Sequence, residues 1–264
     1  MYDSHCHLDF TEFDADRCNV WQRAQATGLL GLLIPGVHPD QWPKAREIAL
    51  ALPNCHTSAG LHPHWIKRLK LNTHLELELS HELDRKPCIA IGECGIDRHI
   101  DVSLTQQQTI FGQHLKAAYD YSKPLIIHHR QSHALILEAI KKVRPSSGGV
   151  IHAFSGSLEI AKEYIKLGFK LGVGGVVTYP RANKTRAAVA DIGLEHFLLE
   201  TDAPYMPLYG EQGQRNEPSN VANIAQHIAS LTNTSANDVT RITNENYRQT
   251  FYVPTQDTLN TQSE

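Results

Sequence analysis

The chain begins MYDSHCHLD (residues 1–9), and this stretch places His5 and His7 at the end of a segment that we expect to be a β-strand. Side chains alternate between the two faces of a strand, so both histidines point to one side while Cys6 points to the other. Neutral imidazole is the commonest metal ligand among side chains. A metal site needs three or four ligands, however, and isolated histidine pairs also occur on ordinary surfaces. The pair therefore directs attention to further ligands along the chain.

Apolar strands and helical segments alternate through the rest of the sequence. After the first strand at 1–7, we expect strands within 29–34, 55–61, 88–91, 124–127, 149–151, 169–173 and 197–199. The helices are expected at 12–26, 43–52, 71–83, 103–121, 134–143, 158–167, 181–191, 219–231 and 237–251. This alternation predicts parallel βαβ units, and eight of them predict an α/β fold of the (β/α)8 TIM-barrel type. A doubly wound open sheet is the alternative, although no G-x-G-x-x-G motif follows the first strand.

Length and composition agree with one large domain. We expect residues 1–254 to form a single barrel domain and residues 255–264 to form a polar C-terminal tail. Hydrophobic residues make up 41% of the 264 residues, which is enough for a sizeable core. The formal net charge of −3 disfavours a basic surface that coats nucleic acid. It leaves room for an enzyme that contacts a few phosphates.

The cysteines and the start of the chain indicate in which cellular compartment the protein is expected. The five cysteines are odd in number and form no C-x-x-C pair, which disfavours a disulfide framework and a cysteine-type zinc site. The first strand starts directly after Met1, which leaves no room for a signal peptide. The longest weakly polar run, 28–37, is too short to span a bilayer. We therefore expect a cytoplasmic protein that does not enter a membrane.

Potential metal ligands follow the predicted strands. Any one of them could be an ordinary polar residue where an apolar strand meets a loop. Together they are mostly histidines with two carboxylates, and the strands of a parallel barrel all open onto one mouth. The pattern therefore predicts a convergent metal site. The residues are His5, His7, His62, Glu93, His128, His152 and Asp202.

The size of this set predicts more than one ion. One tetrahedral ion needs fewer ligands, whereas two divalent ions about 3.5–4 Å apart and bridged by a carboxylate would use them all. Two such ions lower the pKa of water and neutralise charge that develops on a phosphate or carbonyl oxygen. Histidine ligands favour Zn²⁺, Mn²⁺ or other transition ions, whereas Mg²⁺ prefers oxygen ligands. The sequence leaves the identity of the two ions open among Mg²⁺, Mn²⁺ and Zn²⁺.

Seven blocks of sequence, from the start of the chain to about residue 251, resemble the signature of the TatD family of metal-dependent deoxyribonucleases in the amidohydrolase superfamily. The blocks are DSHCHLDF, GLHPH, IGECGID, IIHHR, HAFSG, LETDAPY and RNEPSNV, in this order. The resemblance implies a barrel with two divalent metal ions that share one bridging glutamate, Glu93. It implies that His5, His7, Glu93 and Asp202 hold one ion, and that Glu93, His128 and His152 hold the other.

The chain departs from the family pattern at two positions. Ala153 stands where many members have a cysteine, and we expect no effect on metal binding. Arg98 stands where an aromatic residue is frequent, and this change could alter substrate contacts.

Catalytic and substrate-binding roles follow from residue type and position. Glu93 and Asp202 are the candidate catalytic residues, and Asp202 is either a ligand that also accepts a proton from the attacking water or a ligand alone. Glu200 lies two residues before Asp202 and is expected to orient a histidine. The candidates for binding substrate phosphate are His62, Arg130 and Arg215, with a loop histidine and surface ion pairs as the alternatives.

The resemblance implies a phosphodiesterase that acts on DNA, most specifically a 3′–5′ exodeoxyribonuclease. Barrels host many reactions, so a metal-dependent amide, ester or lactone hydrolase or an aminoacyl-tRNA deacylase is the alternative. A non-catalytic metal-binding or scaffold protein is a third class, which the complete ligand set disfavours. The expected partner is DNA or another phosphodiester substrate, and no obligate protein partner is indicated.

Overall fold

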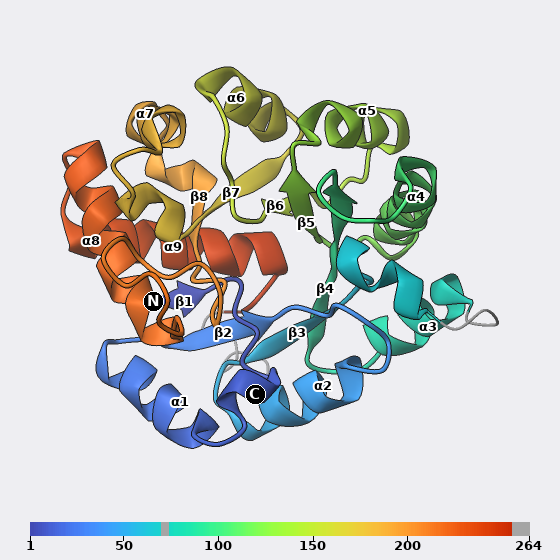
Figure 1. Cartoon of the computed structure of the whole chain (residues 1–264), viewed down its shortest axis with the longest axis horizontal. Helices are drawn as coiled ribbons and strands as arrows, with labels where there is room; N and C mark the ends of the chain where they lie inside the picture. The colour runs from blue at the N-terminus through green and yellow to red at the C-terminus, as the bar shows by residue number, and fades with distance from the viewer. Residues whose placement is uncertain (70–73, 255–264) are drawn as a thin grey trace, which may run out of the picture.

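The computed structural model describes residues 1–69 and 74–254, and this part of the chain forms a (β/α)8 barrel (Figure 1). Its eight strands are parallel and follow one another around the sheet in chain order. The last strand returns to the first, because the amide of Ser4 donates to the carbonyl of Leu199 at 2.8 Å. The predicted barrel is therefore confirmed, and the open doubly wound sheet is excluded.

The bounds of the elements follow the expected alternation. The strands are β1 (Tyr2–Asp3), β2 (Gly31–Ile34), β3 (His56–Ala59), β4 (Cys88–Asp97), β5 (Leu125–Arg130), β6 (Gly149–Ile151), β7 (Phe169–Val173) and β8 (Phe197–Leu199). The helices are α1 (Arg17–Ala26), α2 (Trp42–Ala51), α3 (Leu75–Leu83), α4 (Leu104–Tyr121), α5 (His133–Val143), α6 (Leu158–Lys166), α7 (Asn183–Asp191), α8 (Val221–Thr232) and α9 (Ala236–Phe251). Short 3₁₀ turns are η1 (Thr11–Phe13), η2 (Pro63–Arg68), η3 (Gly175–Thr178), η4 (Leu194–His196) and η5 (Pro218–Asn220).

Most of the strands are apolar because both of their faces are covered. In β5, Leu125, Ile126 and Ile127 are fully buried, with side chains that alternate between the barrel interior and the surrounding helices. The helices turn one apolar side toward the sheet, as Phe111 and Leu115 do from α4. Ser103 caps α4, as the sequence predicts, because its side chain accepts a hydrogen bond from the amide of Gln106 at 3.2 Å.

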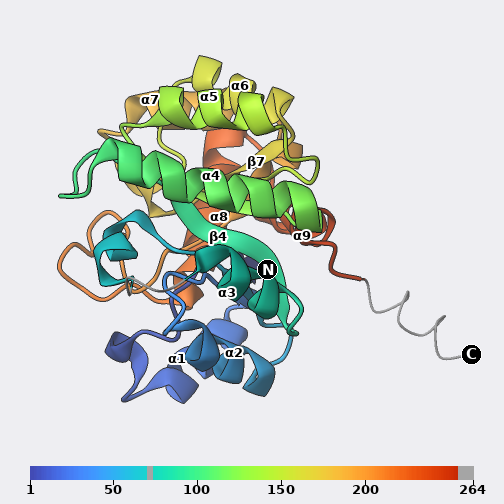
Figure 2. The ribbon, with the colours of Figure 1, turned by 90° about the vertical axis from the view of Figure 1, so that its right-hand side faces the viewer.

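The predicted end of β4 is wrong. The sequence suggests that the strand stops at residue 91, whereas β4 continues to Asp97 and forms the long curved strand of Figure 2. Gly92 and Gly95 do not end the strand: they have φ values of +130° and +150° and lie against β5. A Cβ atom on Gly95 would lie 2.0 Å from the carbonyl oxygen of His128. These glycines therefore permit a close approach of two strands, and Glu93 lies within the strand instead of at its end.

Other boundaries also differ from the expectation. The first strand ends at Asp3, so His5 and His7 lie just beyond it. The first helix begins at Arg17, because a 3₁₀ turn that buries Phe13 precedes it. The third begins at Leu75, and residues 71–73 of its predicted range lie outside the described residues, as does the predicted tail at 255–264.

The carboxyl ends of the strands and the segments that follow them form one mouth of the barrel. The turn η2 after β3 and the long loop after β8 lie on the same side of the molecule, at the left of Figure 2. None of the helices in residues 1–69 and 74–254 is long and apolar enough to cross a membrane.

Candidate metal centre

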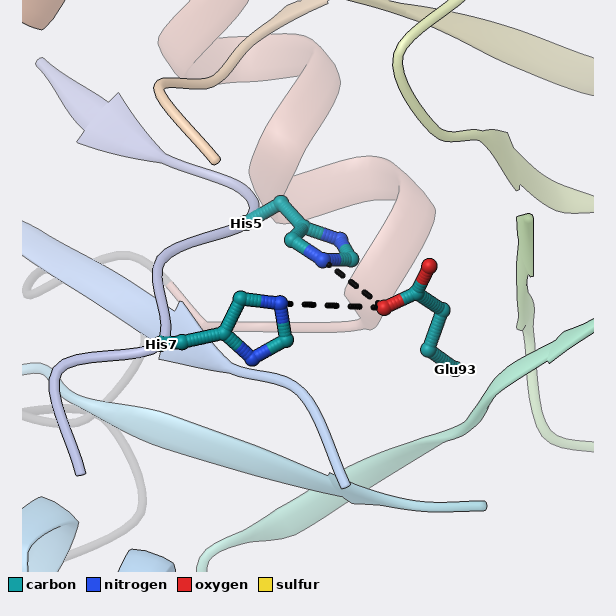
Figure 3. A group of neighbouring side chains, drawn as sticks. All are labelled: His5, His7 and Glu93. Carbon is teal, nitrogen blue, oxygen red and sulfur yellow. Dashed lines mark ion pairs between the residues drawn. The ribbon is translucent and has the colours of Figure 1, made fainter. Parts of the chain in front are cut away.

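His5 and His7 approach one carboxylate from the segment after β1. Figure 3 shows both imidazoles directed toward Glu93 of β4. The Nε2 atoms of His5 and His7 lie 3.1 Å and 3.8 Å from Oε2 of Glu93. Cys6 points away into the core and is fully buried, so the predicted division of the two faces is confirmed.

The other oxygen of Glu93 faces a second group of histidines. Oε1 lies 3.0 Å from Nδ1 of His128 on β5 and 3.4 Å from Nε2 of His62, which follows β3. His152, which follows β6, is further away, with its Nε2 atom 4.0 Å from the same oxygen. The two oxygens of one carboxylate thus face two different sets of imidazoles.

Asp202 completes the centre from the loop after β8. Its Oδ1 atom lies 3.5 Å from Nε2 of His7 and 3.6 Å from Nε2 of both His5 and His152. The residue has a φ of +57°, a conformation that aspartate tolerates better than most residues, and its amide donates to the carbonyl of His5 at 2.9 Å. The first and last strands of the barrel therefore hold Asp202 against the first two histidines.

Glu200 supports His152 from behind. Its Oε1 atom lies 3.1 Å from Nδ1 of His152 and accepts a hydrogen bond of 2.6 Å from the amide of Ala153. Gly172 of β7 leaves room for this carboxylate, since a Cβ atom there would lie 2.1 Å from Oε2 of Glu200. A carboxylate that contacts Nδ1 in this way can orient the histidine, because it leaves Nε2 of His152 to face the centre.

The carboxylates of the centre are anionic at neutral pH. Burial opposes the negative charge of Glu93, but the neighbouring His62 and His5 outweigh it and hold its pKa well below the usual range. Asp202 shows the same balance. Burial raises its pKa, but His152 and the other imidazoles lower it by more, so the pKa of Asp202 lies below its ordinary value. Burial lowers the pKa of His62 to about 4, so this ring is neutral at pH 7. Anionic carboxylates and the neutral imidazole of His62 are donors that a divalent cation binds. Despite burial, the neighbouring carboxylates of Glu200, Asp202 and Glu93 raise the pKa of His152 to about 10, so this ring must release a proton before it binds a cation.

Unpaired donor atoms make the same case for a metal. Neither ring nitrogen of His5 makes an aligned hydrogen bond with any residue that the structure describes, although both nitrogens are buried, and the same holds for Nδ1 of His7. Buried polar atoms are normally paired, so exceptions mark a place for another partner. Within the described residues, three overlapping groups have one ligand atom each within 4.8 Å of one another. They are His5–His7–Glu93, His62–Glu93–His128 and His5–His152–Glu200.

The predicted substrate-binding residues are placed differently from one another. His62 lies inside the cluster, with Nδ1 accepting from the amide of His64 at 3.1 Å and Nε2 facing Glu93. Arg130 ends β5 two residues after His128, is exposed, and makes no side-chain hydrogen bond or ion pair with any residue the structure describes. Arg215 is instead held by carboxylates, with NH2 2.8 Å from both Asp16 and Glu217. Of the three candidates, only His62 lies within the cluster. Arg215 makes surface ion pairs, which the sequence analysis gave as the alternative to phosphate binding.

Sequence reasoning missed two buried aspartates at the centre. Asp3 accepts from the amide of His5 at 3.2 Å and from the hydroxyl of Thr201 at 2.6 Å, and burial raises its pKa to about 7. Asp97 lies 3.4 Å from Nε2 of His128, on the far side of that ring from Glu93. A signal was available for both, because Asp3 stands two residues before His5 and Asp97 four after Glu93. Residues at these spacings share a strand face.

A parallel barrel with histidines and carboxylates gathered at the carboxyl ends of its strands is typical of metal-dependent hydrolases. The chain matches the family described as TatD related DNase over residues 2–252, and it belongs to this family.

Relatives cover nearly the whole chain. It is 36% identical over 256 residues to the metal-dependent hydrolase YjjV of Escherichia coli K12, covering 96% of this chain and 98% of the relative. The crystal structure of that TatD homologue superposes with a TM-score of 0.91 at 35% identity over the same shares of the two chains. The chain is also 33% identical to the 3′–5′ ssDNA/RNA exonuclease TatD of Edwardsiella piscicida, over 95% of this chain and 99% of the relative.

Proposed function

We propose that this TatD-family hydrolase is a 3′–5′ exodeoxyribonuclease that cleaves single-stranded DNA with two divalent metal ions. The division of Glu93 carries the proposal, because Oε2 faces His5 at 3.1 Å while Oε1 faces His128 at 3.0 Å. A carboxylate so placed suits a bridging ligand. The exonuclease activity named for the Edwardsiella relative supports the choice of substrate.

The residues divide between two ions on this proposal. When bound, divalent ions lower the pKa of water and neutralise charge on the phosphate under attack. His62 lies closer to Glu93 than His152 does, so it is a ligand or a phosphate contact on the second side. The donor sets are His5, His7, Glu93 and Asp202 for one ion, and Glu93, His128 and His152 for the other.

Asp202 is the proposed general base. Its side chain is 15% exposed, so it reaches the mouth while Glu93 is enclosed, and its lowered pKa keeps it anionic. It can accept the proton that the attacking water loses as the phosphodiester bond is cleaved. Glu200 keeps His152 in place by contact with Nδ1 and takes no part in proton transfer.

Arg130 is the proposed phosphate contact, and its replacement gives a first prediction. Arg130→Ala should lower kcat/KM for single-stranded DNA by about 10- to 100-fold, because it removes a charge-assisted contact to phosphate. Metal content should not change, since the ligands remain. The dependence of DNA binding on salt should also become shallower by about 0.7 in the log–log slope, as one phosphate contact is lost. Steady-state kinetics and binding at several salt concentrations measure both effects.

Arg215→Ala is the matched comparison. Arg215 must release Asp16 or Glu217 before it can contact a phosphate, so the expected loss of kcat/KM is smaller than for Arg130→Ala. Equal losses in the two variants would show that exposed charge at Arg130 does not decide phosphate binding. An Arg130→Ala enzyme that behaves as the parent on every active substrate would remove the role altogether.

The substrate proposal is tested by a panel of metals and substrates. Chelator-treated protein is reloaded with Mg²⁺, Mn²⁺ or Zn²⁺ and offered single-stranded DNA, duplex DNA, RNA, aminoacyl-tRNA and simple esters. We expect metal-dependent release of mononucleotides from the 3′ end of single-stranded DNA, inhibited by salt as polyanion binding requires. Turnover of aminoacyl-tRNA or esters with no cleavage of DNA under any metal would instead support the alternative hydrolases.

A further inference from the structure

We propose that Tyr205, backed by Phe10, is a stacking platform for a nucleobase next to the bond that is cleaved. This inference rests on the proposed function and adds to it a specific contact for the base. No residue of the metal centre supplies such a contact, because those residues offer donors for cations and phosphate. A nucleotide beside the scissile phosphate also carries a flat aromatic base, which needs an apolar surface.

The aromatic rings lie directly beside the first set of ligands. The ring of His7 stacks on Phe10, with centroids 4.4 Å apart and planes inclined by 24°. Phe10 meets Tyr205 edge to face at 6.1 Å, and Tyr205 lies 6.2 Å from the ring of His7. The ring of Tyr205 thus adjoins a predicted metal ligand on one side and Phe10 on another, while half of the residue (50%) remains exposed.

The backbone of Tyr205 is fixed relative to Asp202. The amide of Tyr205 donates to the carbonyl of Asp202 at 2.8 Å. The carbonyl of Tyr205 accepts from Nδ2 of the fully buried Asn216 at 2.8 Å, and the same amide group donates to Thr201 at 2.9 Å. A ring anchored in this way keeps its position relative to the reacting phosphate, so stacking on it would also align the scissile bond.

The hydroxyl of Tyr205 differs from that of the nearby Tyr179 in its hydrogen bonding. Tyr179 donates its hydroxyl to the carbonyl of Pro207 at 2.8 Å and packs edge to face on Tyr209. The hydroxyl of Tyr205, by contrast, makes no hydrogen bond with any residue in 1–69 or 74–254. Its outer surface therefore serves no evident packing role within the described part of the chain.

The two sides of the mouth offer different contacts. Tyr205, after β8, offers a half-exposed aromatic ring, which suits a flat neutral base. The exposed Arg130 stands on the side of His128, where Oε1 of Glu93 points. The mouth is therefore suited to bind phosphate on the β5 side and a base on the β8 side.

The test uses oligonucleotides with and without bases at the cleaved end. Parent, Tyr205→Ala and Tyr205→Phe proteins are given a single-stranded DNA and the same strand with abasic sites at its last two 3′ positions. Tyr205→Ala should lower kcat/KM on the intact strand by about 5- to 150-fold, the range for loss of one stacked base. On the abasic strand its rate should match the parent, and Tyr205→Phe should retain the parent rate on both.

A binding measurement without metal separates stacking from catalysis. Chelator-treated parent protein should quench the fluorescence of a 3′-terminal or penultimate 2-aminopurine, and Tyr205→Ala should not. Tyr119→Ala is the control, since Tyr119 is 60% exposed on α4 and has no place in the centre. Circular dichroism melting of each variant shows whether the fold is kept. If the alanine variant does not fold, Tyr205→Leu carries the test, because leucine keeps an apolar side chain but has no flat ring, so it should show the same strand-dependent loss as expected for alanine.

The outcomes distinguish this inference from the proposed function. If the parent cleaves no DNA with any metal, both fall. If the parent cleaves DNA and Tyr205→Ala loses the same factor on intact and abasic strands, the proposed function stands and the platform is refuted. A loss with Tyr205→Phe as large as with Tyr205→Ala would likewise refute it, because the phenyl ring alone should stack.

Discussion

Asp202→Asn should reduce the rate of DNA cleavage by about 10²- to 10⁴-fold, the usual contribution of a general base. Asparagine has nearly the same shape and also tolerates the φ of +57°, so the loop after β8 should keep its conformation. The amide cannot accept a proton from water and binds cations more weakly than a carboxylate. The second donor set, Glu93, His128 and His152, is unchanged, so most of the metal there should remain.

Single-turnover rates measured beside metal analysis decide this prediction. Asp120→Asn is a suitable control, because Asp120 pairs with Lys116 on the outer side of α4. If Asp202→Asn cleaves DNA at nearly the parent rate with its metal retained, Asp202 is a ligand at most, and proton removal needs no side chain there. If all metal is lost with the activity, the residue is required for binding and the assignment of a base is unsupported.

Glu93→Gln should remove metal from both sides of the centre together with activity. Glu93 is the one carboxylate in the described residues whose two oxygens face both sets of histidines. A neutral amide has a single acceptor oxygen and places an NH₂ group toward the other side, where it repels a cation. The total metal bound per chain, measured after dialysis against a metal buffer, should therefore fall by more than the loss of one ion.

Glu200→Gln is the matched variant for Glu93→Gln. Glu200 is also a buried glutamate of the centre, but it contacts His152 through the outer ring nitrogen, 3.1 Å away. Loss of a carboxylate behind a ligating histidine commonly costs about 10- to 100-fold in affinity or activity, which is less than loss of a shared ligand. Equal metal loss in the two variants would argue against a bridging role for Glu93.

Sequence patterns predict the barrel because most of the strands contain a short apolar run and most of the helices have one apolar side. They also predicted the ligand cluster, since parallel strands bring their carboxyl ends to one mouth whatever the details of packing. The glycines at 92 and 95 misled the prediction of β4. Glycine ends many strands, but here it permits β5 to approach, and only the position of His128 reveals the difference.

The roles of charged residues at the rim depend on tertiary neighbours. Arg130 and Arg215 are similar in the sequence, since each stands at one end of a family-like block. Arg130 nevertheless makes no ion pair with any described residue, whereas Arg215 lies between Asp16 and Glu217. Asp16 is 199 residues away from Arg215 along the chain, so no local pattern announces the pair. Asp97 is missed for a different reason. A strand that is expected to end at residue 91 does not place Glu93 and Asp97 on one strand face, whereas β4 extends to Asp97 and brings it to His128.

On the proposed mechanism one glutamate, Glu93, holds two ions in one centre. Anomalous diffraction at the manganese edge, from crystals soaked in Mn²⁺ at concentrations that saturate activity, tests it most directly. We expect two peaks about 3.5–4 Å apart, one beside the oxygen of Glu93 that faces His5 and one beside the oxygen that faces His128. A single peak, or two peaks of which one does not contact Glu93, would show that Glu93 does not bridge two ions.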